Sequence, residues 1–220
     1  MLHYLQNLFQ ALDFSSLADA VLRVAAVFLC LTVHETCHGL AALALGDPTA
    51  KSMHRLSLNP LRHIDWLGLA LMFVAGFGWA KPVPVNPSYF RKPKQGMAIT
   101  ALAGPISNIL LAVLFLEIGK VIYLYAPYSD GMNTFFDWCL FTVAPMSVGM
   151  GLFNLIPFPP LDGSKVLAVF LPDGAYMKLM HYERYGILIL LALSWLGLGG
   201  NALGNAIYGV YEALFHIFFA

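Results

Sequence analysis

Long apolar stretches separated by short polar ones dominate the chain. Runs long enough to cross a bilayer as helices cover about residues 20–45, 97–125 and 135–158, and residues 185–220 hold one or two more, divided at 197–201. The first run ends at Gly46 and Pro48, because glycine favours a helix C-terminus and proline cannot continue a helix. The pattern predicts an all-α polytopic membrane protein, a bundle of about four to six membrane segments. We expect one domain over residues 1–220, with its core at about 20–165 and C-terminal helices at 185–220.

Three other segments do not fit a simple membrane helix. Residues 1–19 carry leucines at helical spacing and no Lys or Arg, which predicts a helix lying along the membrane surface. Residues 66–79 form an apolar run, interrupted by glycines, that is too short to cross the bilayer in the usual way. We expect a short re-entrant or β-hairpin element there. Residues 81–87 contain three prolines and should be extended.

Composition places the chain in the membrane class. Hydrophobic residues make up 59% of the sequence and charged residues 11%, with a mean hydropathy of +0.71, values that exclude an ordinary soluble globular protein. The formal net charge is zero and no basic stripe is interleaved with aromatic residues, so we expect membrane lipid and not nucleic acid as a partner. The three cysteines include no C-x-x-C pair, which argues against a thiolate metal site. The sequence does not fix the oligomeric state and leaves a homodimer open.

The basic residues predict the orientation of the chain. Of the twelve Lys and Arg residues, those at positions 51, 55, 62, 81, 91, 92 and 94 lie between the first and second predicted membrane helices. Short loops rich in Lys and Arg stay in the cytoplasm. The first helix should then run inward, and the loop near Asp130 and Asp137 should lie outside. We expect a multi-pass protein of a bacterial cytoplasmic membrane.

Two imidazoles and a carboxylate lie inside the first predicted membrane helix, in its cytoplasmic half. His34, Glu35 and His38 form an H-E-x-x-H pattern. His34 and His38 are one turn apart on one helix face, a spacing from which two imidazole nitrogens can bind one zinc ion. In this motif the glutamate is a general base towards water that the metal activates. The alternative is a polar helix seam in which the histidines bind carbonyls, but ionisable groups inside a bilayer usually indicate function.

A third metal ligand must come from elsewhere, because hydrolytic zinc sites commonly use three protein ligands. Asp162 is the candidate at a similar membrane depth, in a turn that contains three prolines and is followed by Gly163. Asp162 could instead cap the helix that follows. Asn154 and Asn108 are candidates to bind the substrate or a developing oxyanion. Interhelical hydrogen bonds are the alternative role for both asparagines.

Six motifs in order along the chain resemble a known family. They are HETCHG at 34–39, GDPTAK at 46–51, LNPLRHID at 58–65, GWAKPVPVNP at 78–87, GPISN at 104–108 and NLIPFPPLDG at 154–163. With them the chain resembles the site-2 protease family of intramembrane zinc metalloproteases, peptidase family M50, in its small members without a PDZ or CBS domain. The resemblance implies one zinc ion held by His34, His38 and Asp162, with Glu35 as the base. It also implies that Asn154 helps to position the substrate and that residues 81–87 lie near the substrate path.

The predicted function is therefore a zinc metalloendopeptidase that cleaves peptide bonds within or near the membrane-spanning segments of protein substrates. Such a substrate must unwind locally, and pairing as a strand with the chain around Val83 and Val85 is one route. A rival interpretation is a zinc-binding membrane protein without proteolytic activity, a transporter or a scaffold. A zinc protease of the prenyl-protein endopeptidase type is another, although it would use a glutamate where this chain offers Asp162.

Overall fold

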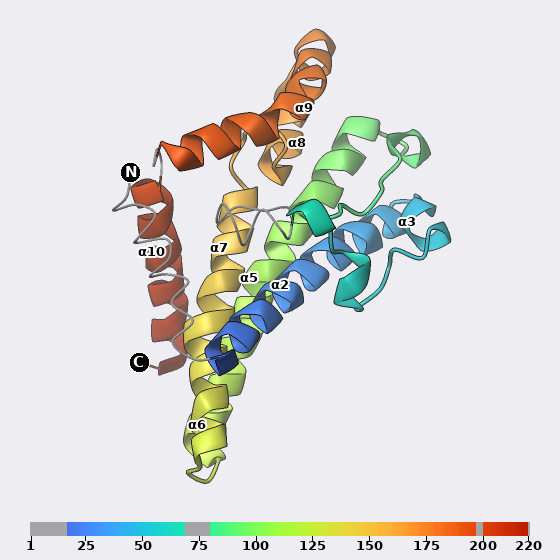
Figure 1. The fold of residues 1–220 in the computed structure, drawn as a ribbon. Helices are drawn as coiled ribbons and strands as arrows, with labels where there is room; N and C mark the ends of the chain where they lie inside the picture. The colour runs from blue at the N-terminus through green and yellow to red at the C-terminus, as the bar shows by residue number, and fades with distance from the viewer. Residues whose placement is uncertain (1–16, 69–79, 197–199, 220) are drawn as a thin grey trace.

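The structure is a computed structural model that describes residues 17–68, 80–196 and 200–219 (Figure 1). Three apolar segments dominate it: α2 (Leu17–Ala44), α5 (Pro93–Tyr125), and a continuous segment made of α6 (Asp130–Asp137), η3 (Trp138–Val143) and α7 (Ala144–Asn154). Each of the three is long and apolar enough to cross a membrane. The all-α membrane class predicted from the sequence is confirmed.

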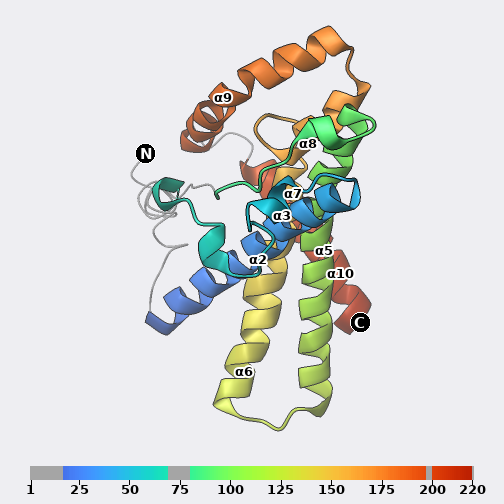
Figure 2. The ribbon, with the colours of Figure 1, turned by 90° about the vertical axis from the view of Figure 1, so that its right-hand side faces the viewer.

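Shorter elements complete the described chain. They are α3 (Thr49–Ser52), η1 (Pro60–Arg62), η2 (Pro87–Tyr89), α8 (Asp162–Leu167) and η4 (Ala168–Phe170), followed by α9 (Asp173–Trp195) and α10 (Gly200–Phe219). α9 lies across one end of the bundle, and α10 runs beside α7 (Figures 1 and 2). The region predicted at 185–220 thus holds parts of two helices. The first of them begins at Asp173, earlier than an apolar run could indicate, because its first turns are polar.

Two predicted elements lie largely outside the described residues. The surface helix expected at 1–19 and the re-entrant or hairpin element expected at 66–79 fall mostly in the ranges 1–16 and 69–79. At the edges of the second range, Ile64 and Ala80 form an isolated antiparallel bridge. The amide of Lys81 also donates to the carbonyl of His63 at 2.9 Å. The chain at His63 and Ile64 therefore lies beside the chain at Ala80 and Lys81.

α5 is the centre of the bundle and packs on α2, α7 and α8. Small residues let the helices approach closely, as is usual in membrane proteins. Ala26 and Cys30 of α2 are fully buried against Leu111 of α5. Further along α5, a Cβ on Gly119 would lie 1.9 Å from the side chain of Leu140, so a larger residue there would require Leu140 to move.

A π-helical turn, η3, interrupts the third membrane segment. A wider turn of this kind leaves backbone carbonyls for other donors. The carbonyl of Leu140 accepts a hydrogen bond from the Tyr211 hydroxyl of α10 at 2.9 Å. At the start of η3, the indole of Trp138 donates to the carbonyl of Leu22 on α2 at 2.7 Å. These two bonds join α2 and α10 to the third membrane segment, beside α5.

Candidate metal centre

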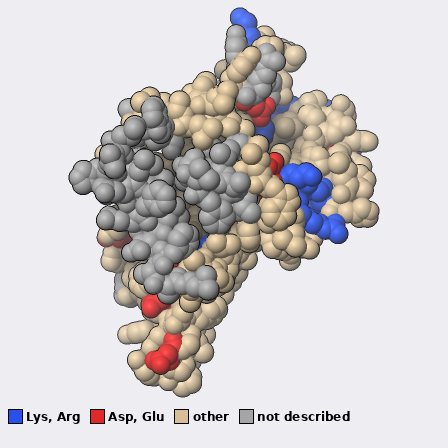
Figure 3. Space-filling model, in the orientation of Figure 1, with Lys and Arg blue, Asp and Glu red and all other residues tan. Residues whose placement is uncertain are grey.

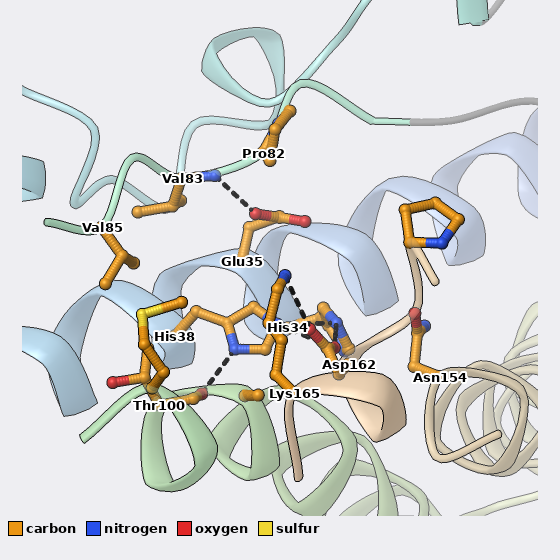
Figure 4. Close-up of a pocket in the computed structure, with 13 residues that line it drawn as sticks. His34, Glu35, His38, Pro82, Val83, Val85, Thr100, Asn154, Asp162 and Lys165 are labelled. Carbon is orange, nitrogen blue, oxygen red and sulfur yellow. Dashed lines mark hydrogen bonds and ion pairs between the residues drawn. The ribbon is translucent and has the colours of Figure 1, made fainter. Parts of the chain in front are cut away.

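Three predicted ligand side chains converge on one point. The Nε2 atoms of His34 and His38 lie 2.9 Å apart, and each is 3.1 Å from Oδ2 of Asp162 (Figure 4). All three residues are buried, with 3%, 9% and 8% of their surface exposed. Tetrahedral zinc with bonds of about 2.0–2.1 Å separates its ligand atoms by about 3.3 Å. The three atoms can therefore share one metal ion with little movement.

The fold brings these residues together from two helices far apart in the sequence. His34 and His38 project from one face of α2, and Asp162 is the first residue of α8. The residue before α8, Leu161, makes no side-chain cap, and the Asp162 carboxylate turns to the histidines. A tight turn makes this possible, since a Cβ on Gly163 would lie 2.1 Å from the carbonyl oxygen of Leu155. The structure therefore does not support a capping role for Asp162.

The other nitrogen of each imidazole is held by α5. Nδ1 of His38 donates to the backbone carbonyl of Thr100 at 2.7 Å, and Nδ1 of His34 lies 3.1 Å from Oδ1 of Asn108. With the proton of each neutral ring on Nδ1, both Nε2 atoms carry lone pairs. Two lone pairs and a carboxylate oxygen then face one another in a buried space, an arrangement that a shared cation stabilises. This donor set, two imidazoles and one carboxylate, suits zinc.

Glu35 lies beside the cluster, at the wall of a pocket. It is 9% exposed, and its Oε2 accepts a hydrogen bond from the backbone amide of Val83 at 2.8 Å. The pocket has a volume of about 320 Å³ and is lined by the three clustered side chains, by Glu35 and by Asn154. Figure 4 shows the chain from Pro82 to Val85 across the pocket from α5. A water molecule and an extended peptide could reach the cluster here.

One protein of similar sequence aligns with almost the whole chain. The Bacillus subtilis protein named "Putative zinc metalloprotease YwhC" is 35% identical over 204 residues, which are 87% of this chain and 91% of the relative. The chain belongs to this zinc metalloprotease family. The clustered histidines and aspartate are thus the candidate zinc ligands of a metalloprotease.

More distant relatives carry the same description. The Rip2 protein of Mycolicibacterium smegmatis is 28% identical over 178 residues, 79% of this chain and 66% of that protein. The Methanocaldococcus jannaschii protein MJ0611 is 29% identical over 109 residues, 46% of this chain and 49% of that protein. Both carry the name "Putative zinc metalloprotease". No protein-family model and no solved structure matches the chain.

The two asparagines expected to bind substrate lie in different places. Asn154 lines the pocket, and its Nδ2 donates to the carbonyl of Met150 at 2.9 Å. Asn108 is fully buried behind His34 and is not among the pocket residues. The backbone carbonyl of Asn108 accepts a hydrogen bond from the hydroxyl of Ser147 at 2.8 Å, and this bond joins α5 to α7. Asn108 is thus placed to orient His34, a candidate metal ligand.

Sequence reasoning missed two groups that contact the clustered histidines and aspartate. Nζ of Lys165 lies 3.9 Å from Oδ1 of Asp162 and 4.0 Å from Oε1 of Glu183, so it faces the carboxylate oxygen that the histidines leave free. Its position three residues after Asp162 was a usable signal. The second group is the carbonyl of Thr100, which binds His38. A backbone group carries no side-chain signature, so no residue type could have indicated it.

Gly104 explains how α5 comes so close to the imidazoles. A Cβ at this position would lie 2.4 Å from Nε2 of His38 and 2.6 Å from Cε1 of His34. We therefore expect Gly104→Ala to displace both rings. Overpacking of this kind costs about 1–3 kcal/mol, so zinc affinity should fall about ten- to a hundredfold. Competition with a zinc chelator of known affinity measures the change.

The matched control for this substitution is Gly204→Ala on α10, where a Cβ would meet nothing within 4 Å. It should bind zinc as the unmodified protein does. Equal affinity of Gly104→Ala and the unmodified chain would show that the imidazoles are not the zinc ligands.

Proposed function

We propose that this protein is an intramembrane zinc metalloendopeptidase of the site-2 protease type. Its substrates are membrane proteins, cut within or near their spanning segments. The observation that carries this proposal is the position of the buried His34, His38 and Asp162 cluster, two of whose members lie in α2, a helix apolar enough to cross a membrane. The family supports metalloprotease chemistry, and the apolar helix supports a place for that chemistry within the bilayer.

The residues of the site divide the work of peptide hydrolysis. His34, His38 and Asp162 would hold the zinc ion, which would supply activation of water near neutral pH and polarisation of the scissile carbonyl. Glu35 accepts the proton of the attacking water and passes it to the leaving amine. Asn154 has a second amide hydrogen beyond the one bound to Met150, so it can donate to the scissile carbonyl oxygen.

Access to the scissile bond is the remaining requirement, because the peptide groups of a membrane helix are paired with each other. The extended chain from Pro82 to Val85 lines the pocket and offers a neighbour to an unwound substrate. A substrate strand lying along this segment would replace its lost helical hydrogen bonds with bonds to the protease. This route supports cleavage of substrates whose spanning helices unwind easily.

The charge distribution supports an inward-facing site. Lys and Arg residues gather where α2 ends and α5 begins, and acidic residues lie at the opposite end of the bundle, where α6 begins at Asp130 and ends at Asp137 (Figure 3). By the positive-inside rule, this distribution supports an orientation in which the first end, and with it the metal centre, faces the cytoplasm. We propose a multi-pass protein of a bacterial cytoplasmic membrane with its site in the cytoplasmic half.

Reconstitution tests the proposal. The purified chain in proteoliposomes should cleave a tagged single-span substrate within or near its span, lose this activity with 1,10-phenanthroline and regain it when zinc is restored. Casein serves as the soluble control and should be cut far more slowly. A protein that retains zinc and cuts none of a panel of single-span substrates would instead be a metal-binding scaffold or transporter.

A further inference from the structure

The chain beside Glu35 is unusually poor in backbone donors. We call residues 81–86 the wall segment, because Pro82, Val83 and Val85 line the pocket. Its prolines have no amide hydrogen, so Val83 is the donor between Pro82 and Pro84. That amide binds Oε2 of Glu35 at 2.8 Å. The orientation of the Glu35 carboxylate therefore depends on where the wall segment lies.

One end of the wall segment is held by Asp47. This residue is fully buried just after α2, where Gly46 turns the chain with a φ of +102°. Its Oδ2 accepts the amide of Asn86 at 2.7 Å, and its Oδ1 accepts the amide of Thr49 at 2.9 Å and the Thr49 hydroxyl. Burial alone would raise the pKa of Asp47, but the bonds from Thr49 and Asn86 outweigh it and lower the pKa. The carboxylate is therefore charged, which strengthens its hydrogen bonds.

The other end is held by Arg55. Its Nη2 donates to the carbonyl of Lys81 at 2.8 Å and lies 3.3 Å from that of Pro82. Val83, between these two anchors, is 7% exposed and packs on α2. Gly39 permits this contact, since a Cβ there would lie 3.1 Å from Cγ1 of Val83. The wall segment is thus fixed at both ends and pressed on the helix that carries Glu35.

We propose that Asp47 and Arg55 are positioning residues of the proteolytic site: they hold the wall segment so that the Val83 amide fixes the carboxylate of Glu35 in the pocket. This inference rests on the proposed function for its catalytic consequence. Neither side chain is among the pocket residues, so both act through the backbone. A displacement of about 1 Å at a catalytic group can cost about a hundredfold in rate, so loss of either anchor should be visible in kcat.

The test compares Asp47→Asn and Arg55→Ala with two matched controls in the full-length protein. Ser52→Ala removes an exposed hydroxyl that binds the carbonyl of Thr49 and makes no bond to Asp47, and Arg62→Ala removes an exposed arginine that binds the carbonyl of His54. Hydrogen exchange resolved by fragmentation measures the exchange rates of the amides in the wall segment, and elemental analysis measures the zinc content. Cleavage of a single-span substrate gives kcat and KM.

We expect one zinc ion per chain in all four variants. In Asp47→Asn and Arg55→Ala the Val83 amide should exchange about tenfold faster or more, and kcat should fall about ten- to a hundredfold with little change in KM. The controls should match the unmodified protein. Faster exchange at Val83 in Asp47→Asn is informative because the Asp47 carboxylate binds the amide of Asn86, three residues further along the wall segment.

Unchanged Val83 exchange and unchanged kcat in both anchor variants would overturn the proposal, and so would equal losses in Ser52→Ala. If Asp47→Asn does not fold, Arg55→Ala decides alone. Exchange at Val83 does not require activity, so a protein that cuts no substrate but shows the expected exchange would refute the proposed function and leave the anchors standing.

Discussion

Replacing His38 with alanine should remove zinc from the protein and abolish proteolysis. The substitution leaves His34 and Asp162 as two ligands in a buried space, and two ligands do not hold zinc at micromolar concentration in competition with water. Zinc content should fall from one ion per chain to nearly none, with cleavage of a single-span substrate below detection. Elemental analysis of the purified variant and a cleavage assay measure the two effects together.

His216→Ala is the matched control, because His216 is exposed on α10 and pairs only loosely with Glu212 at 3.9 Å. It should retain both zinc and activity. A His38→Ala protein that is folded and still carries one zinc ion would place the metal elsewhere.

Glu35→Gln should keep zinc and lose activity by about 10²–10⁴-fold, the usual contribution of a general base. The side-chain oxygen of glutamine can still accept the Val83 amide that binds Oε2 of Glu35 at 2.8 Å, so the wall segment should stay in place. The side-chain amide of glutamine, unlike a carboxylate, cannot accept the proton of the attacking water. The rate is measured in single turnovers with the zinc content of the same sample.

This substitution distinguishes loss of the general base from loss of the zinc ion. A Glu35→Gln protein with more than about a tenth of normal activity and full zinc content would exclude Glu35 as the base. Loss of zinc along with activity would instead mean that the carboxylate supports the metal centre.

The helices that could be predicted are those whose burial in lipid leaves an apolar run. α2 and α5 lie within a few residues of the predicted ranges, and the third segment ends at Asn154 and not at 158 because prolines follow. The apolar run predicted from residue 185 misses the beginning of α9 at Asp173. The first turns of this helix hold polar residues such as Lys178 and Glu183, which interrupt the hydropathy signal. Hydropathy detects helices that contact lipid. A helix that lies across the end of the bundle, as α9 does, need not contact lipid along its whole length.

The site was predictable where function depends on a side chain at a fixed spacing. His34 and His38 follow helical geometry, and Asp162 stands out because prolines and glycine surround it. The backbone partners were not predictable, since the carbonyl of Thr100 and the amide of Val83 have no residue signature. For polar residues such as Asn108, sequence gives the chemistry but not the direction in which the side chain points.

Zinc K-edge X-ray absorption of the purified protein tests the central claim most directly. The account predicts one zinc ion per chain with nitrogen and oxygen neighbours at about 2.0–2.1 Å and the scattering pattern of two imidazoles, from His34, His38 and Asp162. A sulfur neighbour at about 2.3 Å would contradict it, because one of the three cysteines would then be a ligand in place of one of these residues.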